Sequence, residues 1–145
     1  MIKIFSSIKL VYLYVLYFFV GLDEDYFYNE KGNRLAEIGA NRAAIKALER
    51  ANKDLQYPKI FGAIGWSYLQ LEQYENALEN YRKAYENDES LEILCGVAVA
   101  EMKAGSQDES KRIYEILKFH RNRPGLEIVI SNLEKGYEDP NYSGI

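Results

Sequence analysis

A spacing of 33 residues between similar side chains is the feature that most constrains the fold of this chain. Four columns of residues follow that spacing: Gly32, Gly65 and Ala98; Ala44, Ala77 and Ser110; Leu48, Tyr81 and Tyr114; Ala51, Ala84 and Leu117. Small residues let two helices approach closely, and larger apolar residues fill the seam between them. Four columns in one register therefore predict a stack of repeated units.

Within each unit the apolar residues are spaced as on one face of a helix. In the central unit Phe61, Ile64, Gly65 and Tyr68 follow at intervals of three, one and three residues, and the pattern resumes at Tyr74. Two such helices joined by a tight turn form an antiparallel hairpin, whose apolar side must be buried by neighbouring hairpins. The sequence predicts helices over 24–38, 41–54, 58–71, 74–87, 91–104 and 107–121, and a capping helix over 125–136.

Residues typical of helix ends support these boundaries. Gly39 and Gly105 follow the first helices of units one and three, where a left-handed backbone is common. Ser90 is suited to an N-cap, and Ser106 and Glu109 form the pattern of a capping box. Two prolines suit the first turn of a helix: Pro58 and Pro124.

The first 22 residues differ from the rest in hydropathy and charge. They contain Lys3 and Lys9 but no acid, and the 13 residues from 10 to 22 carry no charge. Three roles remain open: an uncleaved membrane anchor over residues 4–22, a removed signal peptide, or a helix that packs on the body or between two copies. In a membrane, the lysines before the run and the acids after it predict a body on the non-cytoplasmic side.

The central unit resembles the tetratricopeptide repeat. The family pattern of Trp, Leu-Gly, Tyr, Ala-x-x-x-Phe and Ala is similar to Phe61, Ile64-Gly65, Tyr68, Ala77 with Tyr81, and Ala84. Units 25–57 and 91–123 keep parts of the pattern, and the spacing of 33 is one residue shorter than the usual period of the family. The resemblance implies an all-α fold, in which three hairpins and the capping helix form a right-handed superhelix over residues 23–136. We expect residues 137–145 to be a disordered tail.

The same resemblance implies a concave groove, lined by the first helix of each hairpin, that binds a peptide or helix of another protein. The groove positions are Asn29, Asn33 and Glu37; Lys59, Ala63, Trp66 and Gln70; and Glu92, Gly96, Val99 and Lys103. Trp66 is the expected anchor, because indoles are frequent at interface centres, with packing between first helices as its alternative role. Members of this family that bind the C-terminal carboxylates of heat-shock chaperones use Lys, Asn and Arg at set positions, and in this chain only Asn33 fits that set.

Charge and composition disfavour several other functions. Outside the first 22 residues the chain carries 16 basic and 22 acidic residues, an unsuitable balance for binding nucleic acid. Cys95 is the single cysteine and His120 the single histidine, which leaves little for a metal site or a catalytic triad. We expect Cys95 to be a small buried residue. We therefore expect no enzyme activity, no catalytic residue, no metal and no cofactor.

These observations predict a membrane-tethered or exported adaptor that binds another protein in its groove, and homo-oligomers are compatible with it. One alternative is a soluble, secretion-type chaperone in the cytoplasm that uses residues 1–22 as a dimerising helix. The other is a structural subunit of an envelope assembly that associates through the ends of the stack.

Overall fold

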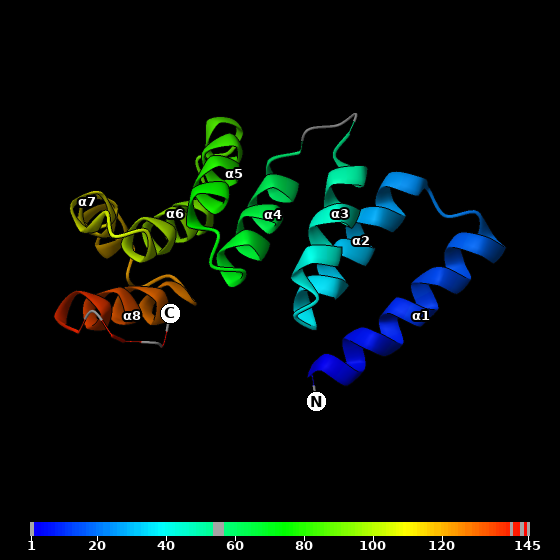
Figure 1. Ribbon diagram of the computed structural model, residues 1–145, viewed down its shortest axis with the longest axis horizontal. Helices are drawn as coiled ribbons and strands as arrows, with labels where there is room; N and C mark the ends of the chain where they lie inside the picture. Colours follow the sequence, from blue (N-terminus) through cyan, green and yellow to red (C-terminus); the bar gives the residue numbers. More distant parts are fainter. Residues whose placement is uncertain (1, 54–56, 140, 143, 145) are drawn as a thin grey trace.

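The structure is a computed structural model that describes residues 2–53, 57–139, 141, 142 and 144 (Figure 1). In this part of the chain it contains eight helices and no strand. The helices are α1 (Ile2–Val20), α2 (Glu24–Glu37), α3 (Asn41–Ala51), α4 (Pro58–Gln70), α5 (Tyr74–Asn87), α6 (Leu91–Lys103), α7 (Gln107–Lys118) and α8 (Leu126–Glu138). The predicted all-α fold is confirmed. Residue 54, the predicted end of the second helix, lies outside the described residues.

The helices form three hairpins, α2–α3, α4–α5 and α6–α7, and each hairpin packs against the next along the chain. They follow one another from α1 at one end of the molecule to α7 and α8 at the other (Figure 1). The first helices of successive hairpins also touch, α2 with α4 and α4 with α6. The predicted succession of helical hairpins is therefore confirmed.

The turn inside each hairpin has the same geometry at the same offset of 33 residues. Gly39, Glu72 and Gly105 all have a left-handed backbone, with φ of 83°, 59° and 90°. The residue after each of them donates its backbone N–H to a carbonyl five residues earlier, with N–O distances of 2.9, 3.0 and 2.8 Å: Ala40 to Leu35, Gln73 to Tyr68, and Ser106 to Glu101. These bonds satisfy carbonyls at the helix end. The left-handed turns predicted at Gly39 and Gly105 are confirmed.

Replacing Glu72 by glycine should raise the free energy of unfolding by about 1 kcal/mol. Glu72 is the one non-glycine residue with positive φ among the described residues, and a Cβ in that conformation costs roughly 1 kcal/mol. Urea unfolding followed by circular dichroism measures the change. Gly39→Ala is the matched control. A Cβ at position 39 meets nothing within 4 Å, so only its left-handed backbone should matter, and the free energy of unfolding should fall by a similar amount. A glycine at position 72 that leaves stability unchanged would contradict the turn geometry.

The columns of the 33-residue repeat lie in the seams of the hairpins. A Cβ on Gly32 would lie 2.5 Å from Cγ of Leu48, and a Cβ on Gly65 would lie 3.1 Å from the ring of Tyr81. Both would also come within 3.2 Å of a backbone oxygen, that of Ala44 or Ala77. The same contacts thus recur one repeat apart, which explains why small residues stand at these positions.

The third hairpin replaces apolar positions of the repeat with paired polar side chains. Ser110, which stands in the alanine column, is buried and donates its hydroxyl to the carbonyl of Ala98 at 2.7 Å. The Tyr137 hydroxyl lies 2.8 Å from the same Ser110 oxygen. Glu101 is also buried, and it accepts a hydrogen bond from Nη2 of Arg82 at 3.0 Å. Buried polar groups with partners avoid the cost of lost hydration, so the third unit packs despite its weaker pattern.

The predicted capping helix is present as α8 and closes the α6–α7 hairpin. Leu126, Ile130 and Leu133 are buried in the same cluster as residues of α6 and α7. Tyr114 of α7 donates its hydroxyl to Oε1 of Glu134 on α8 at 2.8 Å. That hydrogen bond raises the pKa of Tyr114 to about 12.

Three predicted details of the helix ends are wrong. Ser106 is the N-cap of α7, but its side chain makes no capping hydrogen bond, because the residue has ψ of 63° instead of an extended backbone. Ser90, with ψ of 148°, does cap α6 as predicted. Pro124 lies in the turn before Gly125, the left-handed N-cap of α8, and α7 ends at Lys118 instead of residue 121. Pro58 does stand in the first turn of α4.

The N-terminal helix α1 packs along α2. Phe27 of α2 is 2% exposed and stacks on Tyr17 with ring centroids 4.2 Å apart. Leu13 is buried in the same contact, and the buried Ser6 donates its hydroxyl to Glu37. No helix in the described part of the chain has the length and apolar character required to cross a membrane.

The predicted disorder of residues 137–145 stays a prediction. Residues 140, 143 and 145 lie outside the described residues. Residues 137 and 138 belong to α8, and the Tyr142 hydroxyl donates to Oδ1 of Asn132 at 3.1 Å.

Candidate functional site

Three adjoining hollows run along the side of the stack formed by the first helices, and together we call them the groove. The first hollow, of about 590 Å³, lies between α2 and the start of α4, and the second, of about 600 Å³, lies between α4 and α6. The third, of about 410 Å³, lies between α4, α6 and α8. Neighbouring hollows share lining residues: Lys59 and Asp88 join the first two, and Trp66 joins the second and third.

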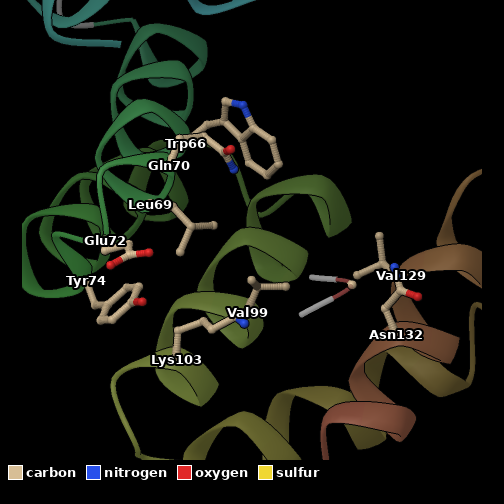
Figure 2. Close-up of a pocket in the computed structure, with 10 residues that line it drawn as sticks. Trp66, Leu69, Gln70, Glu72, Tyr74, Val99, Lys103, Val129 and Asn132 are labelled. Atoms are coloured by element: carbon tan, nitrogen blue, oxygen red, sulfur yellow. The ribbon is translucent and has the colours of Figure 1, made fainter. Parts of the chain in front are cut away.

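Trp66 occupies the centre of the groove. Its side chain is 50% exposed, and it lines two of the three hollows. Figure 2 shows Trp66 on α4 and Asn132 on α8 on opposite sides of the third hollow, with Val99 of α6 between them. The two sequence neighbours of Trp66, Gly65 and Ser67, are both buried, and Ser67 donates its hydroxyl to the Ala63 carbonyl at 3.0 Å. An indole that is half exposed in this setting can contact a ligand from both sides.

The groove combines amide, cationic and apolar side chains along its length. Asn29 and Asn33 lie one helical turn apart on α2, and Nδ2 of Asn33 is 3.4 Å from Oδ1 of Asn29. Lys59 contributes a positive charge to the first two hollows, and Lys103 contributes one to the third. Asparagine amides donate to and accept from a peptide backbone, whereas lysines attract carboxylates. The acidic side chains of Glu72, Asp88 and Glu92 line the same hollows, so the lining suits a peptide with an apolar side chain and charges of both signs.

Most of the predicted groove residues line these hollows. They are Asn29, Asn33 and Lys59 in the first; Lys59, Trp66 and Glu92 in the second; and Trp66, Gln70, Val99 and Lys103 in the third. The structure thus brings together predicted residues from α2, α4 and α6 along one side of the molecule.

Three predicted positions line none of the three hollows. Glu37 lies against α1, where hydrogen bonds from Ser6 and then Arg34 hold the pKa of its carboxyl below the usual range. Ala63 packs beside the cluster of apolar residues between α3 and α4. Gly96 lies against Tyr81. A Cβ at position 96 would be 2.4 Å from atoms of the Tyr81 ring.

The structure adds residues that the sequence reasoning missed. Tyr57 and Ser90 stand one repeat apart as the N-caps of α4 and α6, and each lines a hollow. Both residues immediately precede the first helix of a hairpin, and this shared position in the repeat could have predicted that they line the groove. Val129 and Asn132 line the third hollow from α8, a helix that contacts α6. No local pattern indicated that α8 would face Trp66.

Burial holds two potentially reactive side chains in and near the groove in their neutral forms. Cys95 is buried, and burial raises the pKa of its thiol to about 11, so the thiol is protonated near neutral pH. Tyr81 lines the second hollow, but burial raises the pKa of its phenol and keeps it neutral. Within the described residues, no three His, Cys, Asp or Glu side chains are grouped so that they could hold a metal ion.

No protein-family model matches the chain, and no curated protein matches it.

Proposed function

We propose that this protein is a non-enzymatic interaction module that binds a peptide or helix of another protein in the groove. The observation that carries this proposal is the row of three adjoining hollows, two of which share Trp66, a half-exposed indole. Interface anchors are enriched in tryptophan, and an anchor acts best in a pocket that closes around it. The lining offers amide, charged and apolar contacts to a bound chain.

The register of the hairpins supports a finer version of the proposal. The turns at Gly39, Glu72 and Gly105, and the seams at Gly32 and Gly65, repeat at a constant offset. A constant offset between stacked hairpins produces a regular coil with one curved inner surface. We propose that the three hairpins are tetratricopeptide-type repeats coiled as a right-handed superhelix, with α2, α4 and α6 on the inner side.

Trp66 offers a direct test of groove binding, because it is the only tryptophan in the chain. Peptides that lack tryptophan can be selected from a displayed random library for binding to the full chain. Their binding should shift the fluorescence of Trp66 to the blue and protect it from quenching by acrylamide. Trp66→Ala should weaken the same peptides by about 2 kcal/mol, or about 30-fold, measured by the anisotropy of a labelled peptide.

The matched control is Phe119→Ala at the C-terminal end of α7. Phe119 is also an exposed aromatic residue, 87% exposed, and it lines none of the three hollows. Peptide affinity should be unchanged in this variant. Loss of affinity with Phe119→Ala but not with Trp66→Ala would contradict groove binding and favour a structural subunit that associates through its ends.

The contacts of α1 favour one of the three roles considered for residues 1–22, namely a helix that packs on the body. Leu13 and Phe27 are buried between α1 and α2, so removal of α1 would expose an aromatic core residue. We therefore include α1 in the interaction module. The membrane-tethered or exported location stays a separate prediction, which carbonate extraction and protease protection of membranes would test.

A further inference from the structure

Most of the exposed large apolar side chains in the described part of the molecule lie on α1, chiefly on its outward side. Eight large side chains on it are between 45% and 85% exposed: Ile4, Phe5, Ile8, Val11, Tyr12, Val15, Phe18 and Phe19. A large apolar side chain presents roughly 150–250 Å² when fully accessible, so together they expose on the order of 1,000 Å². Patches of this size on a water-soluble protein mark a surface that another molecule covers.

The spacing of these residues is that of a helix packed between other helices. Ile4, Ile8, Val11, Val15 and Phe18 follow at intervals of four, three, four and three residues, which is the a/d pattern of a coiled-coil seam. Ile4, Val11 and Phe18 take the d positions. The residues that follow them are also apolar or aromatic: Phe5, Tyr12 and Phe19. A face with apolar residues at a, d and e is typical of a helix that faces the interior of a bundle.

We propose that α1 pairs two copies of this chain through its outward face. The exposed area on one copy, on the order of 1,000 Å², exceeds the roughly 800 Å² per partner that a stable interface of standard size buries. A two-fold pair places the same face on both sides, so it needs a face without net charge. None of the eight side chains is charged, and Lys9 borders the face, about 40° around the helix from Phe5, where its ammonium group can stay in water.

The charges around α1 favour a second copy over a membrane surface. Peripheral helices are attracted to anionic lipids through basic residues beside their apolar face. Here Asp23, Glu24 and Asp25 follow the C-terminal end of α1, and Glu37 lies at its other end in contact with Ser6. Lys3 and Lys9 are the charged residues of α1, and these four acids outnumber them, so the surroundings of the face carry no net positive charge.

The mass of the full chain in solution tests the pairing. In aqueous buffer without detergent, sedimentation should give twice the 16.8 kDa of one chain at micromolar concentration. Ile8→Lys places a charge in the seam of each copy and should raise the dissociation constant of the pair by at least about 100-fold, leaving a folded monomer. Val11→Lys is a second variant in the same seam and should behave in the same way.

Ile128→Lys on α8 is the matched control, because Ile128 is 63% exposed and Ile8 is 60% exposed. It should keep the mass of the pair, and all variants should keep the circular dichroism of the parent. A monomeric or polydisperse parent, or a folded Ile8→Lys chain that stays paired, would overturn the proposal. A parent that is monomeric and floats with anionic vesicles, when Ile8→Lys does not float, would assign the face to a membrane instead.

Discussion

Leu117→Ala should lower the free energy of unfolding by about 3–4 kcal/mol, measured by urea denaturation followed by circular dichroism. Leu117 is 0% exposed and belongs to the cluster that joins α6, α7 and α8. Truncation removes the buried carbons and leaves a cavity, because Ile113, Ile130 and Leu133 are held by their own helices. The cost should therefore include both the lost burial and the unfilled space.

Ile116→Ala is the control for this loss, since Ile116 is the preceding residue and is 50% exposed. Its truncation should cost less than about 1 kcal/mol, because much of the side chain is already in water. Equal losses at the two positions would mean that α7 does not present Leu117 to α8. Such a result would also remove the basis for placing Val129 and Asn132 beside Trp66.

Gly32→Val should lower the free energy of unfolding by about 3 kcal/mol, at the upper end of the cost of overpacking. A Cβ at position 32 would lie 2.5 Å from Cγ and 2.8 Å from Cδ2 of Leu48, and Leu48 is fully buried. The valine cannot be accommodated by rotation of an exposed side chain, so α2 and α3 must separate. Thermal and urea unfolding of the full chain measure the effect.

A double-mutant cycle tests the cause of that loss. Leu48→Ala removes the two closest of the three atoms that the new Cβ would meet, so the two substitutions together should cost at least about 1 kcal/mol less than the sum of the single losses. Gly62→Val in α4 is the matched control, because a Cβ at Gly62 meets nothing within 4 Å. Stability there should change by no more than about 0.5 kcal/mol. Additive losses in the cycle would contradict the Gly32–Leu48 contact.

Much of the groove could be predicted because its residues inherit their positions from the repeat. The 3.6-residue period places Lys59, Trp66 and Gln70 on one side of α4, and the resemblance to the tetratricopeptide pattern predicted that this side lines the groove. Asn33 and Val99 stand on the equivalent helices α2 and α6 and also line hollows. Glu37 is the exception, because α1 supplies the Ser6 hydroxyl that binds its carboxylate. That contact joins residues distant in sequence, and the periodicity of the repeat does not predict it.

The sequence by itself determined the helices, their turns and the seams of the hairpins, because these depend on hydrogen bonds and side-chain sizes within one repeat. Gly39 and Gly105 mark turns through their backbone freedom, and Gly32 marks a seam through its lack of a side chain. Only the tertiary structure decided what happens at the two ends of the stack. There the neighbours are not repeats, so α8 came to line the groove and α1 turned its apolar face outward. Those outcomes depend on contacts between distant elements, which local patterns do not encode.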